Sequence, residues 1–304
     1  MDSDDTLCYF KNMSENESAQ VSSNGFEYGV KHFYSQKAGA LTEVLFSALN
    51  LTKAESDELL KLGAIYVNHQ RQTSDVDIAE NQLCRVHTKP RRYGCAINWK
   101  ERIIFENQDF LVLNKPSGIP SHPSVDNAIE NSLTQVALAR NIDLQITHRL
   151  DTLTSGLIVY SKTPQFVKNF NVQIQNRNVE KKYVALVENP KTFPLRLIHY
   201  MEPSPRAPKK VSPNFVEGWA PCELEILEQK NHVLYSWIKI DLLTGRTHQI
   251  RSQMAEIGSP ILGDTMYGSK VPYQPEAIAL RACELRFNAG NERFVFNLPE
   301  EFEV

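Results

Sequence analysis

One aspartate stands out among the residues whose type and surroundings could support chemistry. Asp151 lies between Arg149 and a Thr154–Gly156 turn, directly before the apolar run Leu157–Tyr160. An aspartate on a tight loop beside a strand acts as a nucleophile, as a metal ligand or simply as a turn residue. This segment alone leaves those three roles open.

Two downstream segments combine cations with an aromatic ring or a glycine. The segment Arg177–Val187 has a Lys-x-Tyr-x-Ala-x-Val pattern that includes Tyr183. The segment Leu243–Arg251 contains several cations around Gly245, a residue that permits close backbone approach. Three further segments complete the pattern: Asn114–Pro123, which is a weaker candidate, Gly258–Asp264 and Tyr267-Gly268.

With His148–Thr163 around Asp151, these segments resemble, in the same order, the signature motifs of the RluA-type pseudouridine synthases. The similarity spans residues 103 to 270, over half of the chain. It implies isomerisation of uridine to pseudouridine within RNA: the N1–C1′ bond breaks, the uracil turns, and C5 bonds to C1′. This reaction involves no redox change and no energy input, so the resemblance implies neither a metal nor an organic cofactor.

The resemblance implies that Asp151 is the catalytic acidic residue. It acts either as a nucleophile at the sugar or as a base that draws a proton from the ribose, and the sequence leaves both open. Either role needs an ionised carboxylate in a site closed to water. Burial alone would raise the pKa of that carboxyl group, so a neighbouring cation must stabilise its charge. Arg251 occupies the family position that pairs with this aspartate, and arginine can bind a carboxylate bidentately. Tyr183 corresponds to the tyrosine whose ring stacks on the target base and which can help to remove the C5 proton.

Arg149, Arg246 and His248 are the substrate-binding residues that the resemblance implies. A uridine stacked in RNA must be extruded before it reaches Asp151, which costs free energy. Arg149 is expected to enter the space that the base leaves, where its guanidinium can stack and bind phosphate. Arg246 and His248 lie in one loop, where they either fix the loop or contact phosphate.

The sequence departs from the family pattern at two places. Ser252-Gln253 follows Arg251 where the family usually has a histidine in the second position, and Leu280–Asn288 lacks both family histidines and the proline. The three catalytic positions are intact, so these changes indicate a divergent subgroup. The alternative function is a catalytically silent RNA-binding protein with the same fold. An unrelated glycosidase would need two acidic groups where these motifs supply one.

Composition limits the kinds of partner. The 304 residues are 41% apolar and 23% charged, which is typical of a soluble globular protein, and the formal net charge is -3. An RNA partner, rRNA or tRNA, must therefore bind at a local basic groove and not through overall attraction. Five scattered cysteines without a Cys-x-x-Cys pair argue against a disulfide framework and a zinc site. The acidic start and the lack of a long apolar run indicate a cytoplasmic protein that contacts no membrane, and we expect a monomer.

The N-terminal third is expected to contain a tail and a small domain. Residues 1–30 are rich in Asp, Glu, Ser and Asn and predict a flexible acidic tail. Residues 31–93 contain two helical patterns followed by two strand patterns, at 41–49, 53–62, 64–68 and 82–87. Two helices, a glycine and Ile-Tyr-Val-Asn before a basic stretch resemble the alpha-L RNA-binding domain. Lys89, Arg91 and Arg92 at its end are expected to contact phosphate.

Residues 94–304 are expected to form a pseudouridine synthase domain of the α+β class. Strand patterns rich in β-branched and aromatic residues alternate at intervals with helical patterns. This mixture predicts a large, mostly antiparallel mixed sheet with flanking helices and loops. The expected strands include 110–114, 157–160, 183–187, 222–227 and 233–240, and the expected helices are 127–140, 165–176 and 248–257.

Overall fold

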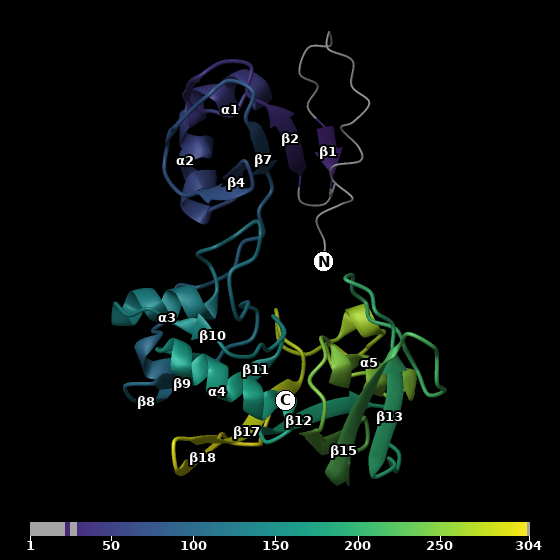
Figure 1. Ribbon diagram of the computed structural model, residues 1–304. Coiled ribbons are helices and arrows are strands. Elements are labelled where there is room, and N and C mark those ends of the chain that lie inside the picture. The colour runs from purple at the N-terminus through teal and green to yellow at the C-terminus, as the bar shows by residue number, and fades with distance from the viewer. Residues whose placement is uncertain (1–21, 25–28, 303–304) are drawn as a thin grey trace. The chain divides into compact units, whose positions relative to one another are not determined.

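The structure is a computed structural model, and it describes residues 22–24 and 29–302 (Figure 1). The chain divides into two compact units. The first comprises the described residues up to Arg92 together with Ser124–Ile129, and the second comprises Tyr93–Pro123 and the described residues from Glu130 onward. Most of the acidic tail expected for residues 1–30 lies outside the described residues.

The first unit packs two helices against a small sheet. Helix α1 (Leu41–Leu49) and helix α2 (Lys53–Leu62) coincide with the two helical patterns of the sequence. Thr52 caps α2: its side chain accepts a hydrogen bond from the Glu55 N–H, and the Glu55 carboxylate accepts one from the Thr52 N–H. The strands are β1 (Ser22–Asn24), β2 (Val30–Tyr34), β3 (Gly39–Ala40), β4 (Ile65–Val67), β5 (Gln70–Gln72), β6 (Asp77–Ile78) and β7 (Leu83–His87). The main sheet has the order β1-β2-β7-β4-β5, and β3 pairs with β6.

Arg91, near the end of the first unit, is engaged within that unit. Its guanidinium donates to both carboxylate oxygens of Asp126, at 3.0 Å from Nε and 2.7 Å from Nη2. Asp126 is buried, whereas Arg92 forms a more exposed ion pair with Glu58 at 2.6 Å. The phosphate contacts expected of Lys89, Arg91 and Arg92 stay a prediction. For Arg91 and Arg92 they would require exchange of a carboxylate partner for a phosphate.

The second unit is built on one large sheet. Figure 1 shows α3 (Ser132–Arg140) and α4 (Pro164–Gln175) over one half of this sheet and α5 (Gln249–Glu256) at the other half. The strands are β8 (Ile103–Glu106), β9 (Phe110–Lys115), β10 (Gln145–Ile146), β11 (Ser155–Ser161), β12 (Glu180–Glu188), β13 (Arg196–Met201), β14 (Val211–Ser212), β15 (Ala220–Asn231), β16 (Tyr235–Leu242), β17 (Leu280–Ala289) and β18 (Glu292–Asn297). Short 3-10 helices lie at Lys100–Arg102 and Thr265–Tyr267. The order is β14-β13-β15-β16-β12-β17-β11-β9-β8, with β10 on β11 and β18 on β17.

Strands β11 and β17 are parallel, and the other strand pairs of this sheet, within the described residues, are antiparallel. Gly156 lies in this parallel pair with φ +112°, and a Cβ there would be 2.2 Å from the backbone oxygen of Ala282. The glycine that follows the Thr-Ser turn is therefore needed where two backbones approach closely. The predicted α+β class with a mixed, mostly antiparallel sheet is confirmed.

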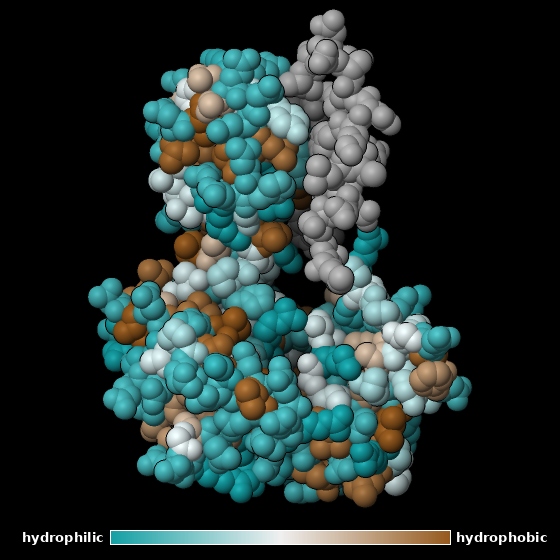
Figure 2. Space-filling model, viewed as in Figure 1, coloured by the Kyte–Doolittle hydropathy of each residue, from teal (hydrophilic) through white to brown (hydrophobic). Residues whose placement is uncertain are grey.

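Apolar side chains pack on both faces of this sheet. Along β11, Ile158 belongs to one core and Leu157 to the other, as expected for alternating strand residues. Phe170 of α4 packs in the second core against Phe287 of β17, with ring centroids 5.2 Å apart. The face of the molecule in Figure 2 is mostly hydrophilic, with scattered apolar residues. Within the described ranges, no helix has the length and apolar character that a membrane span requires.

Candidate active site

The loop that carries Asp151 connects β10 to β11 and is fixed by backbone contacts. The Thr154 N–H donates to the Asp151 carbonyl at 3.0 Å, which closes a turn. The Ser121 hydroxyl donates to the Leu150 carbonyl at 2.7 Å and accepts from the Leu150 N–H at 3.0 Å. Because Ser121 and Leu150 are buried, these bonds hold the backbone on both sides of Asp151.

Lys115, at the end of β9, is a fully buried cation beside the same loop. Its ammonium donates to the carbonyl oxygens of Pro116, Ile119 and Thr152 at 2.8, 2.7 and 3.3 Å. Burial lowers the pKa of Lys115 to about 7, against the opposing effect of the Asp151 charge. Lys115 thus ties the loop after β9 to the loop of Asp151. The signal for this role in the sequence is a lysine that ends an apolar strand before Pro-Ser-Gly.

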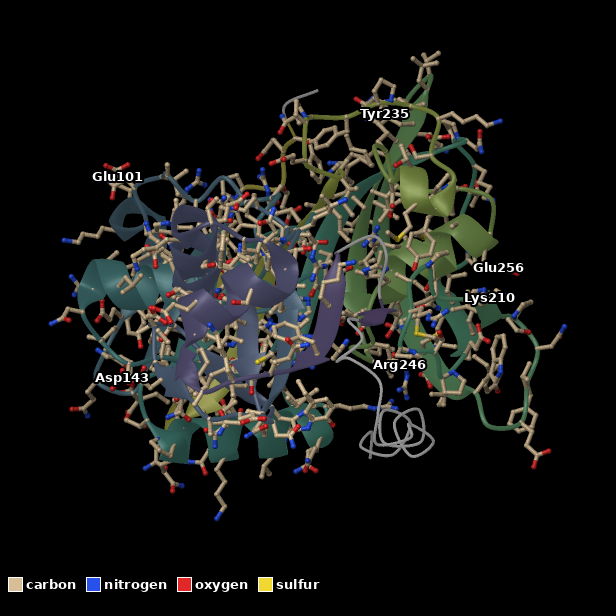
Figure 3. All side chains as sticks on the ribbon, turned by 90° about the horizontal axis from the view of Figure 1, so that it is seen from above. Glu101, Asp143, Lys210, Tyr235, Arg246 and Glu256 are labelled. Carbon is tan, nitrogen blue, oxygen red and sulfur yellow. The ribbon has the colours of Figure 1, made fainter. Side chains whose placement is uncertain are left out.

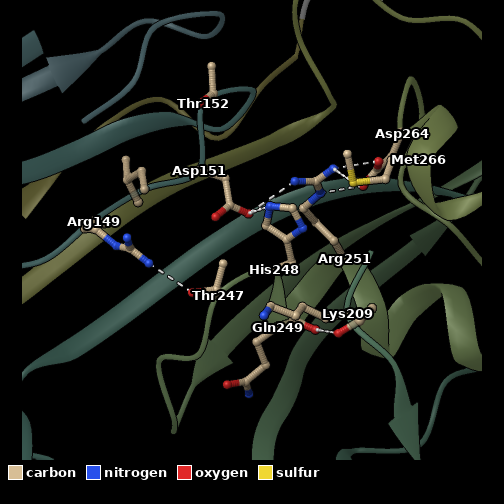
Figure 4. A network of polar contacts seen from close by, with 12 residues as sticks. Arg149, Asp151, Thr152, Lys209, Thr247, His248, Gln249, Arg251, Asp264 and Met266 are labelled. Atoms are coloured by element: carbon tan, nitrogen blue, oxygen red, sulfur yellow. Dashed lines mark hydrogen bonds and ion pairs between the residues drawn. The ribbon is translucent and has the colours of Figure 1, made fainter. Parts of the chain in front are cut away.

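Arg251, in the first turn of α5, extends toward Asp151 (Figure 4). Its Nη1 lies 3.5 Å from Asp151 Oδ2, while Nε and Nη2 donate to Asp264 Oδ2 and Oδ1 at 2.7 and 2.8 Å. Burial by itself lowers the pKa of Arg251, but the hydrogen bonds and charge of Asp264, with the charge of Asp151, raise it on balance. The expected partner, Asp151, is therefore within ion-pair distance. The bidentate carboxylate is Asp264, a residue to which the motifs assigned no role.

His248 lies beside the same carboxylate and ends a chain of polar contacts. It precedes α5 with φ +58°, in the left-handed region. Its Nε2 is 3.9 Å from Asp151 Oδ2, and its Nδ1 is 3.0 Å from the Tyr267 hydroxyl. That hydroxyl also accepts from the Lys209 N–H at 2.7 Å. Burial lowers the pKa of His248 and the Asp151 charge raises it, with a net shift downward, so the imidazole is mostly neutral at pH 7.

Tyr183 lines a cleft of about 340 Å³ together with Asp151. It lies in β12, whose pairing with β17 shifts register between Lys182 and Tyr183. Burial, aided by the charge of Asp151, raises the pKa of Tyr183, so its phenol is protonated at neutral pH. Tyr183 therefore lies in the cleft as a neutral phenol, and the base-stacking role expected of it stays a prediction.

Arg149 is held at the side of the cleft by two polar contacts. Its Nη2 donates to Thr247 Oγ1 at 2.9 Å, and its Nη1 is 3.4 Å from His122 Nε2. Figure 4 shows Arg149 and Arg251 on either side of Asp151. Arg149 is exposed, so a ligand can replace these contacts at little cost.

Arg246 lies in the loop before α5, which Gln249 organises. The Gln249 side-chain oxygen accepts from the Arg246 N–H at 3.1 Å and from the Thr244 hydroxyl at 2.8 Å. Arg246 Nε donates to the Pro221 carbonyl at 2.8 Å. Figure 3 shows Arg246 and Lys210 on the half of the unit that carries α5. The cleft brings together the six residues that the motifs indicated: Arg149, Asp151, Tyr183, Arg246, His248 and Arg251.

Gln253 occupies the place of the histidine that the family usually has two residues after Arg251. It is completely buried, and its amide nitrogen donates to the carbonyls of Leu197 and Cys222, both at 3.3 Å. The same nitrogen lies 3.0 Å from His199 Nδ1. Gln253, which departs from the family pattern, therefore takes part in a buried network in which its amide group is hydrogen-bonded. It does not line the cleft.

The fold of the second unit is shared with solved pseudouridine synthases. The structure of human RNA pseudouridylate synthase domain containing 1 matches with a TM-score of 0.53 and 24% identity, over 65% of this chain and 82% of that chain. A likeness at this level of identity shows the fold alone. The fold is therefore the pseudouridine synthase fold.

Sequence comparison identifies the family. The RNA pseudouridylate synthase family model matches residues 109–256. The chain is 36% identical over 208 residues to RNA pseudouridine synthase 6, chloroplastic, of Oryza sativa subsp. japonica, covering 60% of this chain and 43% of the relative. It is 30% identical over 245 residues to an uncharacterized RNA pseudouridine synthase of Mycoplasma genitalium, covering 76% of this chain and 78% of the relative. The chain therefore belongs to the RNA pseudouridylate synthase family, of the RluA type, whose members are isomerases. It spans less than half the length of the rice relative.

Proposed function

We propose that this protein is an RNA pseudouridine synthase that isomerises specific uridines in RNA. The observation that carries the proposal is the cleft in which Asp151, Tyr183 and Arg251 meet, with Arg251 Nη1 3.5 Å from Asp151 Oδ2. Asp151 is the single carboxylate among the described residues that line the cleft. Family membership supports the reaction class and RNA as the substrate class.

In the proposed reaction, Asp151 acts at the ribose of a uridine that has entered the cleft. Its carboxylate either attacks C1′ as a nucleophile or takes a ribose proton as a base, and Arg251 stabilises the negative charge that both roles need. The N1–C1′ bond breaks, the uracil turns on the ring of Tyr183, and C5 bonds to C1′. The C5 proton then leaves and N1 gains a proton, so the product has the same composition as the substrate.

The charges of the cleft favour a polyanionic substrate. Of the described residues that line it, four are cations and one, Asp151, is a carboxylate, although the formal net charge of the chain is -3. This local excess of positive charge supports the expectation that RNA binds at a basic groove. The cations are Arg149, Lys181, Arg246 and Arg251.

The Asp151→Asn variant tests the proposal. Pseudouridines mapped in cells with and without the gene first identify a target, and a transcript that contains it is then used in single-turnover assays. We expect the variant to lose at least about 10³-fold in rate while its RNA affinity stays within a few-fold. Asp143→Asn, an exposed aspartate outside the cleft, is the control. A rate near that of the wild type in Asp151→Asn would contradict the role of Asp151. RNA binding by a wild-type protein that forms no pseudouridine would favour the silent RNA-binding protein.

We further propose rRNA or tRNA as the target, a monomeric state, and an RNA-binding role for residues 31–93. The two helices and sheet of the first unit are consistent with an alpha-L-like domain, and the pseudouridine map distinguishes the two RNA classes. Light scattering of the purified protein measures its mass in solution and so tests the monomeric state.

We also propose a cytoplasmic location. The four described cysteines are free thiols, as in a reducing compartment: Cys84, Cys95, Cys222 and Cys283.

A further inference from the structure

Lys181 is a cation of the cleft to which the proposed reaction gives no role. It lies in β12, two residues before Tyr183, and both side chains line the cleft. Residues two apart on a strand face the same side of the sheet. The intervening Lys182 instead forms an ion pair with Glu284 at 2.8 Å. Lys181 therefore faces the substrate side, and Lys182 faces away from it.

Lys181 differs from the other cations of the cleft because it has no acceptor among the described residues. In the part of the chain that the structure describes, its ammonium forms neither an ion pair nor a hydrogen bond, and burial without an opposing negative charge lowers its pKa. A half-buried ammonium without a counter-ion is unfavourable, and an anionic ligand would remove that cost. The other cations each have an acceptor: Arg251 has Asp264, Arg149 has Thr247, and Arg246 has the Pro221 carbonyl.

Gly245 shows where the ammonium lies. A Cβ at Gly245 would be 2.9 Å from Lys181 Nζ, so the ammonium lies close to the Gly245 backbone. The ammonium also lowers the pKa of His148 on another wall of the cleft. It forms no ion pair with Asp151. The positive charge of Lys181 therefore lies in the same cleft as Asp151 but is not paired with it.

We propose that Lys181 binds a backbone phosphate next to the target uridine. This inference rests on the proposed function, because it takes RNA as the ligand. Each nucleotide of RNA carries one phosphate charge, and lysine binds phosphate as a compact point charge. A phosphate contact in the same cleft as Asp151 would fix the register of the strand, so that the flipped nucleotide arrives with its ribose at the carboxylate. Lys181 is a positioning residue in this scheme and takes no part in bond making.

Replacement of Lys181 by Met removes the charge with little change in side-chain length. We expect Lys181→Met to weaken binding of a substrate RNA by about ten- to hundredfold and to lower the slope of log affinity against log salt by about 0.7. Lys182→Met is the matched control, because it removes the same charge from the next position on the opposite face, and it should leave the salt slope unchanged. Circular dichroism verifies folding, and Lys181→Gln is the second variant if Met lowers the folded fraction.

RNAs with one neutral methylphosphonate linkage then identify the phosphate. The linkage is moved one position at a time around the target uridine. With the wild-type protein, a neutral linkage at one position should weaken binding about as much as Lys181→Met does. The Lys181→Met variant should bind that same RNA as tightly as it binds the unmodified RNA.

Two results would overturn the assignment of Lys181. One is a set of methylphosphonate effects that are equal in wild type and variant at every position, and the other is a variant with wild-type affinity and salt slope. Pseudouridine formation is measured on the same RNAs with the wild-type protein. Its absence would count against the proposed function, whereas turnover with equal methylphosphonate effects would count against Lys181 alone.

Discussion

Arg251 binds Asp264 bidentately and leaves one nitrogen for Asp151. The two contacts to Asp264 are 2.7 and 2.8 Å, and the contact to Asp151 is 3.5 Å. The side chains of Arg251 and Asp264 are only 3% and 1% exposed, so this pair is fixed in the interior. Asp264 does not line the cleft. The cation beside Asp151 is therefore positioned by a second carboxylate outside the cleft.

The first prediction concerns Asp264→Asn, which removes the charge that holds Arg251. A buried arginine that loses its carboxylate partner is strongly unfavourable, so we expect the free energy of unfolding to fall by about 3–5 kcal/mol. The rate of pseudouridine formation should fall as well, because Arg251 loses its fixed direction. Equilibrium denaturation and single-turnover assays measure the two effects, with exposed Asp143→Asn as the control. Unchanged stability would show that the charge of Asp264 does not hold the guanidinium.

The second prediction concerns Arg251→Lys. An ammonium is a single point charge and cannot contact Asp264 through two nitrogens while a third faces Asp151. We expect the rate at saturating RNA to fall by about 10²-fold. RNA affinity should change much less, because the lost contacts lie between protein groups. Separate measurement of the single-turnover rate and of the Kd for RNA tests this split. A wild-type rate, or a loss of binding alone, would contradict the pairing.

The elements that sequence patterns predicted well are those whose ends are encoded locally. Helix α2 begins after Thr52 because that side chain caps it. Helix α3 was expected from residue 127, which is wrong: it begins after Asn131, whose side chain accepts from the Thr134 N–H at 2.9 Å. The preceding Asn127 donates to the Arg91 carbonyl at 2.8 Å. That contact joins distant segments, and a local pattern cannot show it.

Sequence motifs could indicate those residues of the candidate site that are recognised by their type and their position in a motif. The six residues that the motifs indicated all line the cleft, because the motifs lie on strands and loops that meet at one side of the sheet. The motifs did not show that Asp264 is the bidentate partner of Arg251, or that Lys115 joins two loops. Which carboxylate or carbonyl a cation contacts depends on tertiary packing, and several acceptors near in sequence are equally plausible from the pattern alone.

The third prediction concerns the Tyr267 hydroxyl, which joins His248 to the loop of Lys209. Because this hydroxyl accepts the Lys209 N–H, its own proton is available for His248 Nδ1. The imidazole proton is then on Nε2, 3.9 Å from Asp151. We expect Tyr267→Phe to shift the nitrogen NMR signals of the His248 ring and to lower the single-turnover rate by about tenfold, the size of one hydrogen bond. Tyr235→Phe is the control. Unchanged nitrogen signals of His248 in Tyr267→Phe would contradict this chain of contacts.

The fourth prediction concerns His148 and the pH dependence of stability. The ring stacks on Phe170 with centroids 5.8 Å apart, and its Nε2 accepts from the Val159 N–H at 3.2 Å. Burial, aided by the charge of Lys181, lowers the pKa of His148 from 6.5 to about 3. As the pH falls, the unfolded chain therefore binds a proton at His148 at a higher pH than the folded chain does. The stability that neutral His148 contributes is complete above pH 6.5 and is lost as the pH falls toward 3.

We therefore expect His148→Gln to flatten the fall in stability on acidification. Gln keeps an acceptor for the backbone N–H but does not titrate. Between pH 6 and pH 4 the free energy of unfolding should decrease less steeply in the variant, by about 1 kcal/mol per pH unit. Urea denaturation at a series of pH values measures the two slopes, and His232→Gln, at an exposed position, should keep the wild-type slope. Equal slopes for His148→Gln and wild type would mean that His148 has the same pKa in the folded and unfolded states. That result would contradict a pKa lowered by burial.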